Sequence, residues 1–227
     1  MKKLILMVAS LMIASPINAE NFNEIINSRS YTLKCMIYRK CKDGVKSLND
    51  ISDIASFYPD SNFNIVADEF HRMLTYFKKI GVEVFLGDKR YFPKKYRGIY
   101  SHRKNNIYLN EAYMSNPDGF MRTMRHEGWH VAQDCKKGMK NGRIGIIVSE
   151  KYIPKSYQKS AERLYADRPD EIPYERGAIW ASRVVGMTEA ALESCIENED
   201  KYIIVTKGSL LAAAVKIDNW EKPSKFS

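Results

Sequence analysis

The sequence lacks any apolar run long enough to cross a membrane. Its longest one, residues 4–14, falls well short of the roughly 20 residues that a bilayer-spanning helix needs. Lys2 and Lys3 precede this run, and the small residue Ala19 ends the Pro-broken stretch that follows it. This pattern is typical of a secretory signal peptide over residues 1–19. No cysteine follows the expected cut, which argues against a lipoprotein anchor. We therefore expect a secreted or periplasmic protein with no integral membrane segment after signal removal.

Internal repeats and low-complexity tracts are also absent. The hydrophobic fraction of 44% is normal for a globular protein. Residues 20–227 therefore have the length of one ordinary domain that can bury its own core. Within it we expect a disulfide-closed N-terminal extension at 20–60 and a C-terminal extension at 198–227.

Cysteine is scarce, with four residues in the chain. Export favours disulfides over free thiols, because secreted chains fold in oxidising compartments. Four cysteines allow three pairings, and we favour Cys35–Cys41, which are close in sequence, together with Cys135–Cys195. A four-cysteine zinc site is the weaker alternative, because no Cys-x-x-Cys spacing occurs.

Acidic residues are rare between Asp88 and Lys104, where seven Lys or Arg residues are interleaved with tyrosine and phenylalanine. Basic and aromatic stretches of this kind can bind single-stranded nucleic acid. For an exported protein we favour a solvated loop beside the outer face of a hairpin, and no nucleic-acid partner. The same charge could instead favour acidic substrates or an anionic cell surface.

Histidine is also scarce, and two of the four histidines fall in the segment His126-Glu127-Gly128-Trp129-His130. On a helix His126 and His130 lie one turn apart on the same face, so both imidazoles can bind one metal ion. A catalytic zinc takes three protein ligands and leaves one position for water. Glu127 lies beside the histidines and is the expected general base that takes the proton of that water.

The alternative is that the His-Glu-x-x-His motif occurs by chance, which is expected in on the order of one chain in a hundred of this length. The flanking sequence favours a real site, because Asn116 and Pro117 suit the N-cap and first position of a helix. Small or apolar residues on a second face would bury that helix without occupying the site: Met121, Met124, Gly128, Val131 and Cys135.

Apolar spacing predicts a helix over 63–80 that ends near Gly81. Alternation predicts a strand over Val82–Leu86 and a hairpin formed by Gly98–Ser101 and Asn106–Asn110. Further elements are expected after the His-Glu-x-x-His segment: a strand at Ile144–Val148, helices at Tyr157–Tyr165, Pro173–Val185 and Thr188–Ile196, and then a strand at Tyr202–Val205 and a helix at Ser209–Val215.

With Glu175-Arg-Gly-Ala178 added, the chain resembles the gluzincin branch of zinc metallopeptidases over roughly residues 63–185. In that family a second helix supplies a glutamate as third zinc ligand, often with a small residue three positions later. The resemblance implies a zincin-like α+β fold: a small, mostly antiparallel sheet packed on the motif helix, with further helices C-terminal. It also implies Zn²⁺ held by His126, His130 and Glu175, and a peptide or protein substrate hydrolysed with Glu127 as base. The strand before the motif helix, Asn106–Asn110, would pair with extended substrate.

Glu175 is preferred to Glu171 as the third ligand because of Pro173. Proline suits the first turn of a helix and disfavours helical geometry at the preceding residue, so Glu171 should lie outside the helix. Small residues are expected to let this helix approach the motif helix: Ala178, Ser182 and Gly128.

Several positions depart from related patterns. Lys136 stands where the metzincin branch needs a third histidine, which excludes that branch. Ile179 stands where many gluzincins have an aspartate that orients a ligand, so another acceptor is needed. Asp134, one turn beyond His130, is a candidate. The alternative is that Asp134 is an ordinary surface acid at the end of a helix. Tyr174 is a candidate donor to the transition-state oxyanion.

Two other classes of function compete with the peptidase hypothesis. One is an exported binding or adhesion module on a zincin-like scaffold without turnover, and the other is a helical structural protein with a chance motif. A chain without turnover would usually have lost Glu127 or a ligand, and all motif residues are present. Zinc content, together with the activity of a Glu127→Gln variant, separates the three hypotheses.

Overall fold

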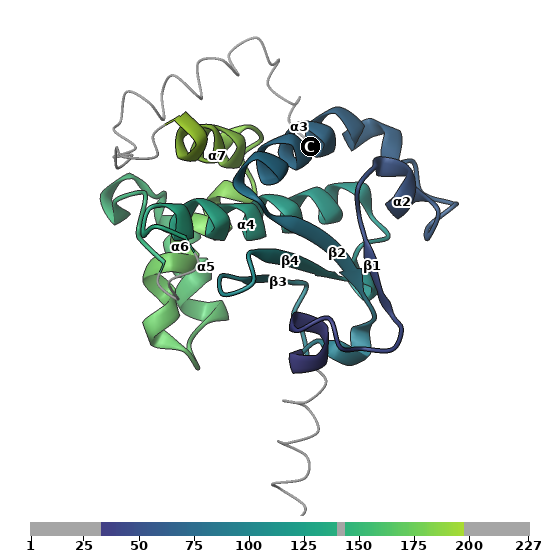
Figure 1. The fold of residues 1–227 in the computed structure, drawn as a ribbon. Coiled ribbons are helices and arrows are strands. Elements are labelled where there is room, and N and C mark those ends of the chain that lie inside the picture. Colours follow the sequence, from purple (N-terminus) through teal and green to yellow (C-terminus); the bar gives the residue numbers. More distant parts are fainter. Residues whose placement is uncertain (1–32, 140–143, 198–227) are drawn as a thin grey trace, which may run out of the picture.

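The computed structural model describes residues 33–139 and 144–197 (Figure 1). The expected signal peptide, the strand at Tyr202–Val205 and the helix at Ser209–Val215 lie outside these residues. The described chain is α+β, as predicted, and its helices pack around one small sheet. None of the helices in this part of the chain combines the length and apolar character needed to cross a bilayer.

Four strands form a mixed sheet in the order β1-β2-β4-β3. The strands are β1 (Val45–Ser47), β2 (Glu83–Gly87), β3 (Gly98–Ser101) and β4 (Asn106–Asn110). β1 pairs antiparallel with β2, and β3 pairs antiparallel with β4, which confirms the predicted hairpin. β2 and β4 are direct neighbours and pair parallel, because β3 is added outside β4 rather than between the two strands. β3 is therefore an edge strand of the described sheet.

The helices lie mainly over one face of the sheet (Figure 1). They are α2 (Ile51–Ala55), α3 (Ala67–Ile80), α4 (Pro117–Cys135), α5 (Lys155–Leu164), α6 (Ile172–Ala181) and α7 (Met187–Glu197). The helix predicted over 63–80 begins with a single 3-10 turn, Phe63–Val66, before α3. Gly81 ends α3 in the left-handed conformation with φ 76°, which glycine adopts without strain.

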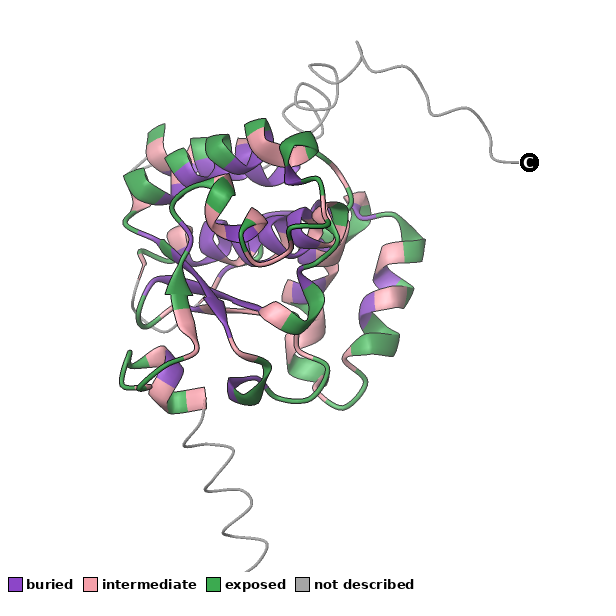
Figure 2. Ribbon diagram, turned by 90° about the vertical axis from the view of Figure 1, so that its right-hand side faces the viewer, coloured by how far each residue is buried: buried purple, intermediate pink, exposed green. Residues whose placement is uncertain are grey.

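Side-chain alternation in the strands separates two apolar clusters. Val84 and Ile107 face α3 and α4 and belong to the main core. Phe85 and Tyr108 face the opposite side, where their rings stack with centroids 5.2 Å apart. Figure 2 shows that the helices bury the faces turned toward the core and expose their outer faces.

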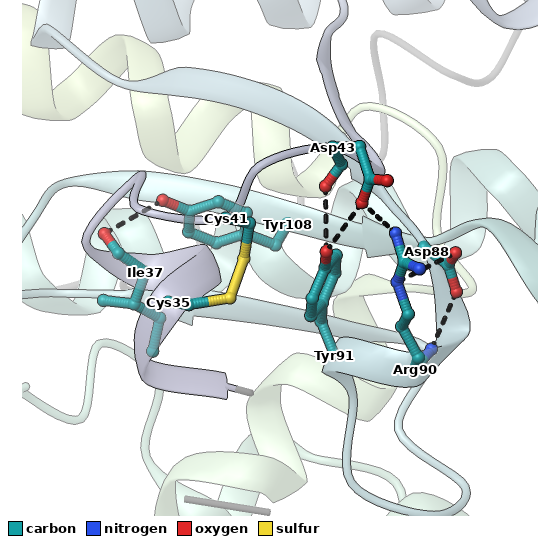
Figure 3. Close-up of a disulfide and its surroundings, with 8 residues drawn as sticks. All are labelled: Cys35, Ile37, Cys41, Asp43, Asp88, Arg90, Tyr91 and Tyr108. Carbon is teal, nitrogen blue, oxygen red and sulfur yellow. Dashed lines mark hydrogen bonds and ion pairs between the residues drawn. A yellow bond between two sulfur atoms is a disulfide. The ribbon is translucent and has the colours of Figure 1, made fainter. Parts of the chain in front are cut away.

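The N-terminal segment covers the second face of the sheet. The disulfide Cys35–Cys41 closes a loop against Tyr108, whose hydroxyl donates to the carbonyl of Ile37 (Figure 3). Tyr91 makes a second hydrogen bond to the N-terminal segment, because its hydroxyl donates to the carbonyl of Asp43 at 2.9 Å. The other disulfide joins Cys135 at the end of α4 to Cys195 in α7. Both favoured pairings are confirmed, and no cysteine is free.

The strand predicted at Ile144–Val148 is wrong. Residues 144–148 are irregular, although Ile147 and Val148 are buried in the main core. The apolar run is therefore explained by packing against helices rather than by strand pairing. One backbone bond, from Gly145 N–H to the carbonyl of Gln133 at 2.8 Å, fixes this segment to α4.

Candidate metal centre

Helix α4 presents the two histidines as the spacing predicted. Asn116 caps the helix by accepting from the backbone N–H of Gly119 at 2.8 Å, and Pro117 occupies the first turn. The rings of His126 and His130 lie edge to face with centroids 4.9 Å apart. Their Nε2 atoms are 3.3 Å apart, so both imidazoles converge on one point.

Glu175 of α6 completes the group. Its Oε2 lies 3.2 Å from Nε2 of His126, and its Oε1 lies 3.3 Å from Nε2 of His130. Glu171 stands outside α6, in the preceding 3-10 turn Pro169–Glu171, and pairs with Arg168 at 2.7 Å. Pro173 lies in the first turn of α6, as predicted, but the residue before it, Ile172, is helical with φ −49° and ψ −44°, so α6 begins one residue earlier than expected and Glu171 is its N-cap residue.

The geometry of these three residues fits a metal ion. Nitrogen and oxygen ligands at about 2.0–2.1 Å from a tetrahedral ion lie roughly 3.3–3.4 Å from one another. The two imidazole Nε2 atoms are 3.3 Å apart, and they lie 3.2 and 3.3 Å from different oxygens of the Glu175 carboxylate. Among the described residues, no donor reaches the buried Oε2 of Glu175 with good hydrogen-bond geometry, which leaves this oxygen available to an ion. Within residues 33–139 and 144–197, this is the one His/Cys/Asp/Glu group with such an arrangement.

The electrostatics of the group favour a cation at the same point. Burial would lower the pKa of His130, but the Glu175 carboxylate outweighs it and raises the pKa to about 9. Burial would likewise raise the pKa of Glu175, and His130 and His126 outweigh it and hold that pKa below its usual range. The metal-free group therefore holds a proton where a metal ion would supply the positive charge.

Glu127 lies beside this group against strand β3. It is buried, and burial raises the pKa of its carboxyl, partly offset by His126 and His130. The backbone N–H of Tyr100 is within hydrogen-bonding reach of the carboxylate. A Cβ at position 98 would lie 2.7 Å from Glu127 Oε1, so Gly98 is what allows the strand to approach.

Gln133, which the sequence argument missed, orients His130. Its Oε1 lies 2.7 Å from Nδ1 of His130. Asp134, the candidate for this role, is fully buried rather than a surface acid, and it accepts from the hydroxyl of Tyr100 at 2.7 Å. Residues i and i+3 on a helix share a face, so the spacing of His130 and Gln133 could have indicated the contact.

A second residue missed from the sequence is Tyr165, just after α5. Its hydroxyl is within hydrogen-bonding reach of the Glu175 carboxylate, and Glu127 is close enough to affect its charge. Burial raises the pKa of Tyr165 above its usual range, and the Glu175 carboxylate raises it further, so the hydroxyl stays protonated. Tyr174, the candidate from the sequence, contributes its backbone carbonyl to Gln133. No local pattern marks Tyr165, because a chain reversal between α5 and α6 brings it to Glu175.

The close packing of α4 also differs in detail from the prediction. Gly128 faces α3 and α7 rather than α6, since a Cβ there would lie 2.9 Å from Thr188 and 3.0 Å from Met73. The close approach of α6 instead depends on Gly177, where a Cβ would lie 2.8 Å from Nε1 of Trp129. Ala178 and Ser182 are buried as expected.

The strand available for an added peptide also differs from the prediction. Strand β4 is paired on both sides, with β2 and with β3, so it cannot accept another strand. Edge strand β3 has only β4 as a partner in the described sheet. Arg97 accepts from the backbone N–H of Asn110, so the alternate residues Gly98 and Tyr100 direct their backbone groups away from β4.

No family model, curated protein or solved structure matches the chain.

Proposed function

We propose that the chain is an exported, zinc-dependent metallopeptidase with a gluzincin-type ligand set on a zincin-like scaffold. The observation that carries the proposal is the convergence of Glu175 from α6 on the two histidines of α4, with Glu127 beside them. Two histidines and a glutamate form a donor set typical of catalytic zinc in peptidases. Structural zinc sites usually have four protein ligands, whereas this group has three.

Each residue has a role that its position supports. His126, His130 and Glu175 hold the ion, and a bound zinc would supply a Lewis acid that polarises a carbonyl and acidifies water. Glu127 takes a proton from the attacking water and passes it to the leaving amine. The raised pKa of this buried carboxyl suits both transfers. The Tyr165 hydroxyl, held protonated near Glu175, donates to negative charge that develops on the carbonyl oxygen.

The substrate that best fits the site is an extended peptide. The backbone groups of Gly98 and Tyr100 face away from β4 beside the metal-binding group, and the N–H of Tyr100 is directed at Glu127. A peptide that aligns with β3 would bring its own carbonyl next to the metal ligands.

Export is part of the proposal. Both disulfides fit an oxidising compartment. The apolar N-terminal stretch supports a signal peptide. N-terminal sequencing of the exported chain tests this, with Glu20 expected as the first residue.

The test of function compares purified mature protein with Glu127→Gln. The proposal expects about one zinc per chain in both proteins and hydrolysis of mixed synthetic peptides in the wild type alone, because glutamine cannot take a proton. Zinc binding without hydrolysis of any peptide in the wild type would instead favour a binding or adhesion module. If neither protein binds zinc, the His-Glu-x-x-His motif is a chance occurrence.

A further inference from the structure

Gln133 contacts both helices that supply metal ligands. The side chain is almost completely buried, with 1% of its surface exposed. At one end Oε1 lies 2.7 Å from Nδ1 of His130 in α4. At the other end Nε2 donates to the backbone carbonyl of Tyr174 in α6 at 3.0 Å. Tyr174 immediately precedes Glu175, so one amide joins the surroundings of two ligands.

The partner in α6 determines which way this amide points. A backbone carbonyl can only accept, so the group facing Tyr174 must be the NH₂ of Gln133. The amide oxygen is then directed at His130, where it can only accept. Nδ1 of His130 must carry the hydrogen, and in the neutral ring Nε2 is left with a lone pair. That lone pair faces Glu175 and His126.

We propose that Gln133 is a positioning residue that selects the metal-binding tautomer of His130 and couples the placement of His130 to that of Glu175. The proposal rests on the metal centre of the proposed function, but not on hydrolysis. A shift of α6 moves the Tyr174 carbonyl and Glu175 together, and the amide transmits that shift to the imidazole. Both ligands are therefore positioned relative to each other before an ion binds.

The backbone of Gln133 strengthens this assignment. Its carbonyl accepts from Gly145 N–H at 2.8 Å, so the irregular segment beside α4 is fixed at the same residue. Trp129, one turn earlier, packs against Gly177 of α6. With the main chain and the neighbouring turn both held, the amide has little freedom to adopt another orientation.

The experiment measures zinc affinity by competition with a chelator for the wild type, Gln133→Met and Gln133→Glu. Methionine keeps the length of the side chain and removes both hydrogen bonds, and we expect a loss of about 10- to 100-fold. Glutamate keeps the acceptor for His130 and loses only the donor to Tyr174. We therefore expect a smaller loss than in Gln133→Met, about three- to ten-fold, because the tautomer of His130 is still set while the link to Glu175 is lost.

Gln158→Met is the matched control. Gln158 is also buried, donates to the carbonyls of Ile153 and Glu150 at 2.7 and 3.1 Å, and lies in α5 away from the metal ligands. The control should lower the Tm of the metal-free protein about as much as Gln133→Met does and leave zinc affinity unchanged. Comparing the two variants separates metal binding from general stability.

Two results would overturn the proposal: wild-type zinc affinity in Gln133→Met, or equal losses in Gln133→Met and Gln133→Glu. Equal losses would show that the contact with Tyr174, not the acceptor for His130, is what matters. If the wild type binds zinc but hydrolyses no peptide, the proposed function fails while this inference stands. A wild type that binds no zinc refutes both.

Discussion

The guanidinium of Arg125 donates two hydrogen bonds, at 2.6 and 2.7 Å, to the carboxylate of Glu69. Both side chains are buried, and Arg125 also donates to the carbonyl of Ser182 at 3.2 Å. The backbone carbonyl of Arg125 accepts from the hydroxyl of Thr188. Arg125 directly precedes His126, so contacts with α3, with the end of α6 and with α7 all meet at the residue before a proposed metal ligand.

This pair gives a prediction on stability. Arg125→Met should lower the free energy of unfolding by about 3–5 kcal/mol, because it leaves the Glu69 carboxylate buried without its partner. Adding Glu69→Leu should recover most of that loss, since an apolar pair of similar volume avoids the desolvation of two charges. Urea denaturation of the three proteins measures both effects. A double variant no more stable than Arg125→Met would contradict the explanation.

The ligand assignment predicts a ranking of zinc affinities. His126→Ala and His130→Ala should abolish stoichiometric zinc binding. Glu175→Ala should weaken it by more than the roughly 10–100-fold cost of losing an outer-shell partner. Glu171→Ala is the control and should stay within a few fold, because Glu171 pairs with Arg168 instead. Inductively coupled plasma analysis and chelator competition give the ranking, and an exchange of the two glutamate results would refute the assignment.

The parts of the site that could be predicted are the local ones. Two histidines one turn apart share a helix face wherever the helix packs, so His126 and His130 followed from spacing alone. Pro173 likewise indicated that Glu175 lies inside the helix and Glu171 outside it. The hairpin followed from alternation, and the disulfides followed from the expected export and from the spacing of the cysteines.

The parts that could not be predicted depend on distant segments of the chain. Tyr165 reaches Glu175 only through the turn between α5 and α6, and no pattern in either helix encodes that turn. The parallel pairing of β2 with β4 places β3 at the edge of the sheet. The strand available to an added peptide is therefore β3 and not β4, which the sequence had indicated. The apolar run at 144–148 looked like a strand because burial against helices requires the same side chains.

The two disulfides should differ in their effect on stability. Cys135–Cys195 spans a sequence separation of 60, and Cys35–Cys41 spans 6. Under the chain-entropy account a tenfold longer loop is worth about 2 kcal/mol more. Replacing both cysteines of the long bridge by alanine should therefore cost more than replacing those of the short bridge. Urea midpoints test the order, and alkylation of the unreduced protein should modify no thiol.

The shifted pKa of His130 predicts how the stability of the metal-free protein depends on pH. The folded-state pKa of about 9 lies above the ordinary value of 6.5. The resulting stability is complete below about pH 6.5 and is lost as pH rises through 9. With zinc bound the ring is already deprotonated, so this loss should disappear. Tm measured from pH 6 to 9.5 with chelator and with zinc tests it. A zinc-bound curve parallel to the chelator curve would contradict it, and metal-free His130→Gln should lack the loss.

Tyr165 and Tyr174 offer a paired test of the oxyanion donor. The Tyr165 hydroxyl is near Glu175 and Glu127, whereas the contact of Tyr174 with Gln133 is through its backbone carbonyl. Tyr165→Phe should therefore lower kcat for peptide hydrolysis by about 10²- to 10³-fold, the usual cost of one oxyanion donor. Zinc affinity and KM should change little, because the lost interaction forms only in the transition state. Tyr174→Phe keeps the carbonyl and should retain kcat. If Tyr174→Phe loses kcat and Tyr165→Phe keeps it, Tyr174 is the donor. If Tyr165→Phe loses zinc affinity by the same factor as kcat, its hydroxyl only supports Glu175.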